Sequence, residues 1–156
     1  MEEWAEIAKE LILGLLERLG TETEVEGFLK EGVLYLEVKS DDKGILIGKH
    51  GRTLESLQIL MNRMVNKRVR KPVRIVLDIA DYRKKRADSL KKMAGRLGEN
   101  VKRTGKEITI GPFIAHDRRI IHIALKEDPS LKTESLGEGD WKKVKIIPTK
   151  LEEQPR

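Results

Sequence analysis

The sequence contains no cysteine among its 156 residues. Disulfide frameworks, thiolate metal sites and thiol nucleophiles are therefore excluded, and the composition fits a reducing, cytoplasmic compartment. Aromatic residues are also scarce, at 4%, which argues against an extensive platform of rings for stacking bases. The longest apolar stretch, around Leu11 to Leu16, is too short to span a bilayer, so no membrane insertion is expected. Glu2 and Glu3 stand where a secretory signal peptide would carry basic residues.

Charge, in contrast, is abundant and unevenly placed. Charged residues make up 37% of the chain, and the formal net charge is +6. Residues 1–66 carry a net charge of −5, residues 67–106 carry +11, and residues 107–156 are neutral overall. A block this basic in the middle of a chain is typical of a surface that attracts a polyanion. A solvated face of a Lys-rich helix is the alternative interpretation.

Hydrophobic periodicity and turn residues predict the elements of the first half of the chain. Expected are a helix over residues 4–19, strands over 25–29 and 33–39, a short helical turn capped by Ser40–Asp42, a helix over 54–65 and a strand over 72–79. The two early strands are joined by the turn Lys30–Gly32 and form a hairpin. Residues 1–80 therefore follow the order α-β-β-α-α-β.

The second half begins with a long helix that Asp81 is expected to cap and Gly105 to end. After it come a strand at 108–110 broken by Gly111–Pro112, a helix over 116–126, and strands over 131–136 and 141–147. The outer face of the long helix is basic, and its apolar stripe comprises Leu90, Met93, Ala94, Leu97 and Val101. For the shorter helix the expected buried side comprises Ile120, Ile121, Ala124 and Leu125.

Four residues, Gly48–Gly51, stand where the short helical turn meets the next helix. Glycine lets the backbone turn and approach a ligand without a steric cost. A helix start exposes unpaired N–H groups and the positive end of the helix dipole, which suits a phosphate. Lys49 and His50 add two side chains that can carry positive charge. The loop therefore predicts contact with a nucleic-acid backbone; a glycine-rich connection without a ligand is the alternative.

With a hairpin upstream and a strand downstream, this loop resembles that of the KH domain in its bacterial type II order. The resemblance implies that the loop clamps the sugar-phosphate of about four nucleotides. The contacts that it implies are Gly48, Lys49, His50, Gly51 and Arg52, with the bases in a groove lined by Ile45, Ile47 and residues of the third strand.

A second constellation is Arg118 and His122, which stand four residues apart and so share one face of the expected helix. With the basic helix before it and the hairpin after it, this spacing resembles the R-three-H domain, named for an Arg and a His separated by three residues. The resemblance implies binding of single-stranded nucleic acid, with the planar fork of Arg118 on a phosphate. His122 would donate a hydrogen bond or hold Arg118 in place, and both roles stay open. Lys84, Lys85 and Arg119 are the remaining candidate contacts.

A KH domain followed directly by an R-three-H domain resembles the Jag family, also called SpoIIIJ-associated or KhpB proteins. The matching motifs are Leu46–Gly51, Thr53–Gln58, Asp78–Arg83, Arg118–His122 and Thr133–Ser135. The resemblance implies a KH domain at residues 1–80, an R-three-H domain at 81–148 and a polar tail at 149–156. The expected fold class is α+β, a type II-like KH domain (α-β-β-α-α-β) packed against a small α/β R-three-H domain.

Two features of this sequence differ from the family pattern. Many members begin with a further small domain and a charged linker that the sequence does not show, so roles that need that domain stay open. Asp117 stands where Glu is expected, which keeps the charge.

Catalytic motifs are not evident. His50, His116 and His122 are scattered without an HExxH pattern, and no Gly-x-Ser-x-Gly elbow occurs. A P-loop is excluded because His50 follows Lys49 where Ser or Thr would bind magnesium. We therefore expect no enzymatic activity, no cofactor and no metal.

The function that follows is non-catalytic binding of single-stranded RNA, with single-stranded DNA left open. The family resemblance implies a bacterial post-transcriptional or cell-envelope regulator and a small single-KH partner protein. The alternative is a protein-interaction adaptor in the control of cell elongation or division, with nucleic-acid binding secondary.

Overall fold

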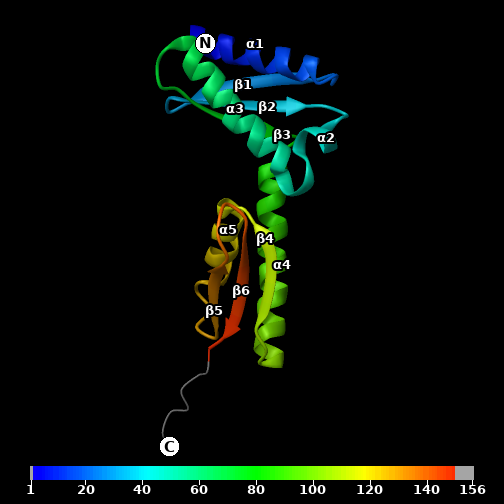
Figure 1. The fold of residues 1–156 in the computed structure, drawn as a ribbon, viewed down its shortest axis with the longest axis vertical. Helices are drawn as coiled ribbons and strands as arrows, with labels where there is room; N and C mark the ends of the chain where they lie inside the picture. The colour runs from blue at the N-terminus through cyan, green and yellow to red at the C-terminus, as the bar shows by residue number, and fades with distance from the viewer. Residues whose placement is uncertain (1, 150–156) are drawn as a thin grey trace, which may run out of the picture. The chain divides into compact units, whose positions relative to one another are not determined.

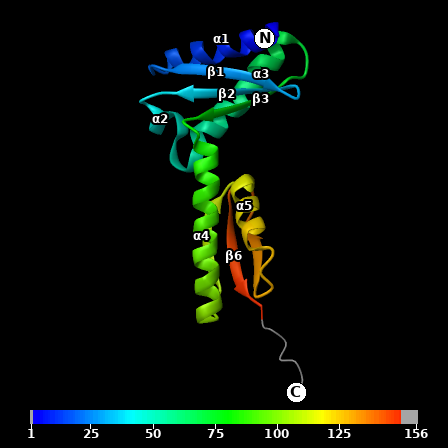
Figure 2. The same ribbon diagram turned by 180° about the vertical axis from the view of Figure 1, so that it is seen from behind.

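Two three-stranded sheets, each with its own helices, make up the α+β fold of the computed structural model, which describes residues 2–149 (Figure 1; Figure 2 from behind). The chain divides into two compact units, residues 1–83 and residues 84–156. Apart from Thr149, the expected polar tail lies outside the described residues. Among residues 2–149, no helix combines the length and the apolar character needed to cross a membrane.

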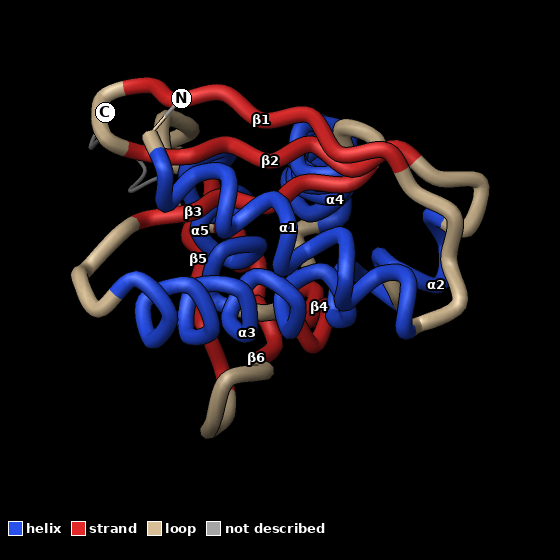
Figure 3. The backbone as a smooth tube through the Cα atoms, turned by 90° about the horizontal axis from the view of Figure 1, so that it is seen from above, coloured by secondary structure: helices blue, strands red, loops and turns tan. Residues whose placement is uncertain are grey.

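The first unit has the order that the sequence predicts. Its elements are α1 (Glu3–Arg18), β1 (Glu24–Lys30), β2 (Val33–Lys39), α2 (Lys43–Ile47), the single 3-10 turn η1 (Lys49–Gly51), α3 (Arg52–Val69) and β3 (Arg74–Ile79). β1 pairs antiparallel with β2, and β2 pairs parallel with β3. Figure 3 shows α1 and α3 on the same side of this sheet, where they share one core with the inward side chains of the strands.

Alternation along the strands places that core as expected. In β2 the buried side chains are Leu34, Leu36 and Val38, and the residues between them face the other side. In β3 the same alternation buries Ile75, Leu77 and Ile79.

Amide side chains of α3 bind the edge of β3 that pairs with no strand. Gln58, Asn62 and Asn66 are four residues apart, so they project from one side of the helix. Their carbonyl oxygens accept hydrogen bonds from alternate strand N–H groups: Leu77 N to Gln58 at 2.6 Å, Ile75 N to Asn62 at 3.1 Å and Val73 N to Asn66 at 2.7 Å. The NH2 groups of Gln58 and Asn62 both donate to the Ile75 carbonyl. An edge strand is thereby covered by side chains instead of by another strand.

Arg83 completes this edge at the end of the first unit. Its Nε donates to the Leu77 carbonyl at 2.9 Å, and its Nη1 lies 3.1 Å from a carboxylate oxygen of Glu55. Its backbone N–H donates to Asp78 Oδ1 at 3.3 Å. Asp81, which the sequence predicts as the cap of the long helix, has φ 55°, outside the extended region of N-cap residues.

Glu37 lies next to that turn and accepts the Asp81 N–H at 2.8 Å. Burial raises the pKa of Glu37, and the nearby carboxylates of Asp78 and Asp81 add to the effect.

The second unit is built on an antiparallel sheet of order β4-β6-β5. Its elements are α4 (Tyr82–Thr104, whose first two residues belong to the first unit), β4 (Ile108–Phe113), α5 (Ala115–Leu125), β5 (Leu131–Leu136) and β6 (Lys142–Pro148). Its core contains the α4 residues Leu90, Ala94 and Val101.

Two expectations for this unit are wrong. β4 does not stop at Gly111–Pro112 but continues to Phe113, because a register shift against β6 between Ile110 and Phe113 accommodates the irregular residues. Ala124 is exposed, because α5 turns Asp117 and Arg118 toward the interior along with Ile121 and Leu125.

The amide cover of β3 generates a stability prediction. Asn62→Ala leaves the Ile75 N–H without its acceptor, and we expect a loss of about 1–3 kcal/mol in the unfolding free energy. Urea denaturation measures the loss, and amide hydrogen exchange at Ile75 locates it. Ser56→Ala, exposed on the same helix, should change stability by no more than about 0.5 kcal/mol. Equal stability of the two variants would contradict the role of the amides.

Candidate nucleic-acid interface

The loop between α2 and α3 is a tight turn in which three of four residues have a positive φ. Gly48 has φ 73° and ψ 179°, His50 has φ 56° and Gly51 has φ 78°. Gly48 N donates to the Gly44 carbonyl at 3.0 Å, and Gly51 N donates to the Gly48 carbonyl at 3.3 Å. These bonds hold the turn between the end of one helix and the start of the next.

Both glycines are also required by close packing. A Cβ on Gly48 would overlap Thr53, with 2.9 Å to its Cβ. A Cβ on Gly51 would lie 2.7 Å from Cε1 of Tyr82. A larger residue at either position would therefore force the backbone of the loop or its neighbours Thr53 and Tyr82 to move.

The side chains between and beside these glycines face solvent. Lys49, His50 and Arg52 are exposed at the start of α3, an 18-residue helix. Ile45 is 71% exposed, whereas Ile47 is half-buried against the core. The loop thus presents cationic groups and one apolar side chain around a helix N-terminus.

The expected lining of the base groove by residues of the third strand stays a prediction. Amides of α3 occupy the N–H groups on the outer edge of β3, so an incoming base would have to displace Gln58 or Asn62 to bind that edge. The other candidate contacts of this unit belong to α2, to the loop and to the start of α3.

Arg118, expected to hold a phosphate, is 9% exposed. Its Nη1 donates to the Phe113 carbonyl at 2.5 Å and to the Asp140 carbonyl at 3.1 Å. These bonds join the end of β4 to the turn before β6. The phosphate contact stays a prediction, and the geometry favours a positioning role. The neighbouring Arg119 is exposed.

His122 is held by two hydroxyl groups of β5. Its Nδ1 lies 2.6 Å from Thr133 Oγ1, and its Nε2 lies 3.0 Å from Ser135 Oγ. Burial lowers the pKa of His122 below its usual value of 6.5, and the positive charge of Arg118 lowers it further. The lowered pKa favours the uncharged ring near neutral pH, and the two contacts tie α5 to β5. A nucleic-acid contact of His122 stays a prediction.

One ion pair beside this motif was not among the sequence candidates. Asp117 Oδ2 accepts from Arg86 Nη2 at 3.0 Å and from Arg86 Nε at 3.2 Å, and the side chains are 4% and 20% exposed. The sequence does show an acidic residue directly before Arg118. It does not show the partner of that residue, because Arg86 lies 31 positions away in the chain.

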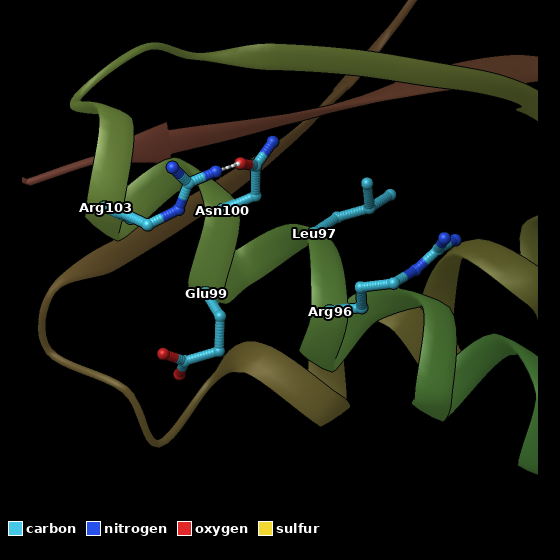
Figure 4. Close-up of a pocket in the computed structure, with 5 residues that line it drawn as sticks. All are labelled: Arg96, Leu97, Glu99, Asn100 and Arg103. Atoms are coloured by element: carbon cyan, nitrogen blue, oxygen red, sulfur yellow. Dashed lines mark hydrogen bonds between the residues drawn. The ribbon is translucent and has the colours of Figure 1, made fainter.

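Two shallow hollows along α4 share Arg96. The first is lined by Arg86, Ser89, Leu90, Lys92, Met93 and Arg96. The second is lined by Arg96, Leu97, Glu99, Asn100 and Arg103, with Arg103 donating to Asn100 Oδ1 at 2.7 Å (Figure 4). We call the ten residues together the α4 track; at about 1.5 Å per residue it is about 25 Å long.

Four of the ten residues of the α4 track are cationic and three are apolar. Lys92, Arg96 and Arg103 are exposed, while Leu97 packs partly against the core. Its acidic member, Glu99, is bound to Lys102 at 2.6 Å. The predicted contacts Lys84 and Lys85 are exposed near the start of α4 but do not line either hollow.

Comparison with known families identifies the domains of both units. Residues 9–78 match the family described as KhpA/KhpB, KH domain, and residues 88–148 match the R-three-H domain. The chain belongs to the KhpB family. This confirms the resemblance that the sequence motifs carried.

Curated relatives of the KhpB family carry the name RNA-binding protein KhpB. The protein of Clostridium symbiosum is 39% identical over 134 residues, which cover 86% of this chain and 60% of the relative. The protein of Lactiplantibacillus plantarum is 31% identical, over 86% of this chain and 42% of the relative. That of Bacillus subtilis is 33% identical, over 71% of this chain and 54% of the relative. The chain thus spans roughly half the length of these relatives.

The buried Arg118 generates the prediction of this subsection. Arg118→Ala removes a charged donor from two carbonyls, so we expect the unfolding free energy to fall by about 2–3 kcal/mol. Urea denaturation followed by circular dichroism measures the change. The matched control is Arg119→Ala, exposed at the next position, which should stay within about 0.5 kcal/mol of the parent protein. A positioning role for Arg118 is wrong if the two variants are equally stable.

Proposed function

We propose that this chain binds single-stranded RNA without catalysis, through the loop Gly48–Gly51 of its KH unit and the α4 track of its R-three-H unit. The observation that carries the proposal is the loop: its backbone is set by two close-packed glycines, and its cationic side chains are exposed beside a helix start. The relatives are named RNA-binding proteins, which supports RNA as the ligand.

The loop suits a phosphate for electrostatic reasons. The first N–H groups of α3 have no acceptor within the helix, and the dipole of an 18-residue helix places partial positive charge at that end. Lys49 adds a full charge next to them. Since single-stranded RNA can separate its bases from its backbone, a KH loop can hold the sugar-phosphate while the bases turn away.

The α4 track suits the backbone of the same class of ligand. Arg96 and Arg103 are exposed and offer planar, multiply donating groups to phosphate oxygens, and Asn100 holds Arg103 in place. It lies within the segment 67–106, which carries a net charge of +11. Contacts of this type release counterions, so the affinity should fall steeply as salt is added.

The remaining parts of the proposal rest on the family. We propose a cytoplasmic location, a role in bacterial post-transcriptional or cell-envelope regulation, and a small single-KH protein as a partner. Absence of catalysis is supported by the names of the relatives, which are those of RNA-binding proteins.

Lys49→Asp tests the loop without altering its glycines. Reversing this exposed charge should weaken binding of a single-stranded RNA oligonucleotide roughly tenfold and lower the salt slope by about 1. Fluorescence anisotropy at several salt concentrations measures both. Lys67→Asp, exposed near the other end of α3, is the control and should bind close to normally. Equal weakening by both variants would contradict a local contact at the loop.

The α4 track is tested by reversing two of its charges. Arg96→Glu with Arg103→Glu should weaken binding of the same RNA by more than tenfold, because two phosphate contacts are replaced by repulsion. Lys106→Glu with Lys126→Glu changes the net charge equally at exposed positions outside the track. If that control pair weakens binding as much, only net charge matters and the track is not a site.

A further inference from the structure

The outer face of the first sheet carries cross-strand rows of side chains that no described helix of this unit covers. Three of the rows run across all three strands, and a fourth, Glu24 with Lys39, joins only β1 and β2. α1 and α3 pack on the opposite face. Pairing register and alternation define the rows: Lys30, Val33 and Arg74; then Phe28, Tyr35 and Val76; then Glu26, Glu37 and Asp78. Neighbouring rows are about 6.6 Å apart, twice the rise per strand residue.

The rows differ in chemistry from one end of the face to the other. The first has two cations, the second is apolar with two aromatic rings, and the third has three carboxylates. Phe28 and Tyr35 stack with ring centroids 5.1 Å apart, and Phe28 is 58% exposed. Although aromatics are scarce in the chain, two of them thus meet on one row of this uncovered face.

We propose that this face is a self-docking surface, on which a second copy of the chain packs face to face with its strands running in the opposite direction. A two-fold axis parallel to the sheets and along the aromatic row places that row on its own copy. The same rotation sets the cationic row of each copy against the acidic row of the other: Lys30 faces Glu26, and Arg74 faces Asp78. The surface is therefore complementary to itself, as a two-fold interface requires.

Other occupants fit the charges less well. With the strands of the two copies parallel, cationic rows would face each other and so would the acidic rows. RNA would bring phosphates next to Glu26, Glu37 and Asp78, which repel them. The raised pKa of Glu37 reflects burial first and then the nearby carboxylates of Asp78 and Asp81.

The size of the face limits the strength of the contact. Three strands present much less than the roughly 800 Å² per partner of a standard interface, so self-association should be weak and concentration-dependent. Glu26 is bound to Lys39 at 2.8 Å within one copy. Both side chains of that pair are more than half exposed, and an exposed ion pair of this kind is readily exchanged for another.

A charge swap on the full chain tests the pairing. Analytical ultracentrifugation from roughly 10 µM to 1 mM should show the parent protein shifting from monomer to dimer. Lys30→Glu places Glu against Glu26, and Glu26→Lys places Lys against Lys30, so each variant alone should dissociate at least about tenfold more readily. An equimolar mixture should associate again, because each variant supplies the charge that the other now lacks.

Each of the other outcomes overturns the proposal. These are a parent protein that stays monomeric throughout, single variants that associate normally, and a mixture that does not recover.

Phe28→Ser provides a second, independent test of the apolar row. It should lower self-association, whereas Ile59→Ser, which removes an exposed apolar side chain on α3, should not. RNA binding is measured on both variants. Loss of RNA affinity in Phe28→Ser with unchanged self-association would make the face an RNA surface and overturn the proposal, while leaving RNA binding itself established.

Discussion

The absence of a side chain at Gly48 and Gly51 is the constraint on which the candidate site depends. Thr53 and Tyr82 occupy the space that a Cβ would need, so the turn between α2 and α3 closes tightly. That closure brings the start of α3 to the surface with Lys49 and His50 exposed around it. A looser turn would keep the same charges but lose the fixed relation between the cations and the helix start.

The cationic side chains divide between the fold and the surface. Arg83, Arg86 and Arg118 are bound within the protein, to carboxylates or to backbone carbonyls, and each ties together segments distant in the chain. Lys49, Arg96 and Arg103 are exposed and carry the proposed affinity for RNA. Net charge alone hides this division: the basic block of residues 67–106 includes both kinds.

Local patterns were enough to predict the elements and the loop. Alternation located β2 and β3, and the spacing of glycines and apolar residues located the turn before α3. Long-range pairing was not predictable in this way. In the sequence the amide residues of α3 are ordinary polar positions, and their bonds to β3 become visible only in the fold. The ion pair of Asp117 with Arg86 is likewise visible only in the fold. Ala124 is exposed, whereas Asp117, Ile121 and Leu125 on the same helix are buried.

Crosslinking tests the central claim most directly. A single-stranded RNA oligonucleotide carrying photoreactive uridines is bound to the full chain, irradiated and mapped by mass spectrometry. The account predicts crosslinked peptides that contain the loop Gly48–Gly51 and peptides from the α4 track, both lost at high salt. Crosslinks confined to other surfaces, or unaffected by salt, would contradict it.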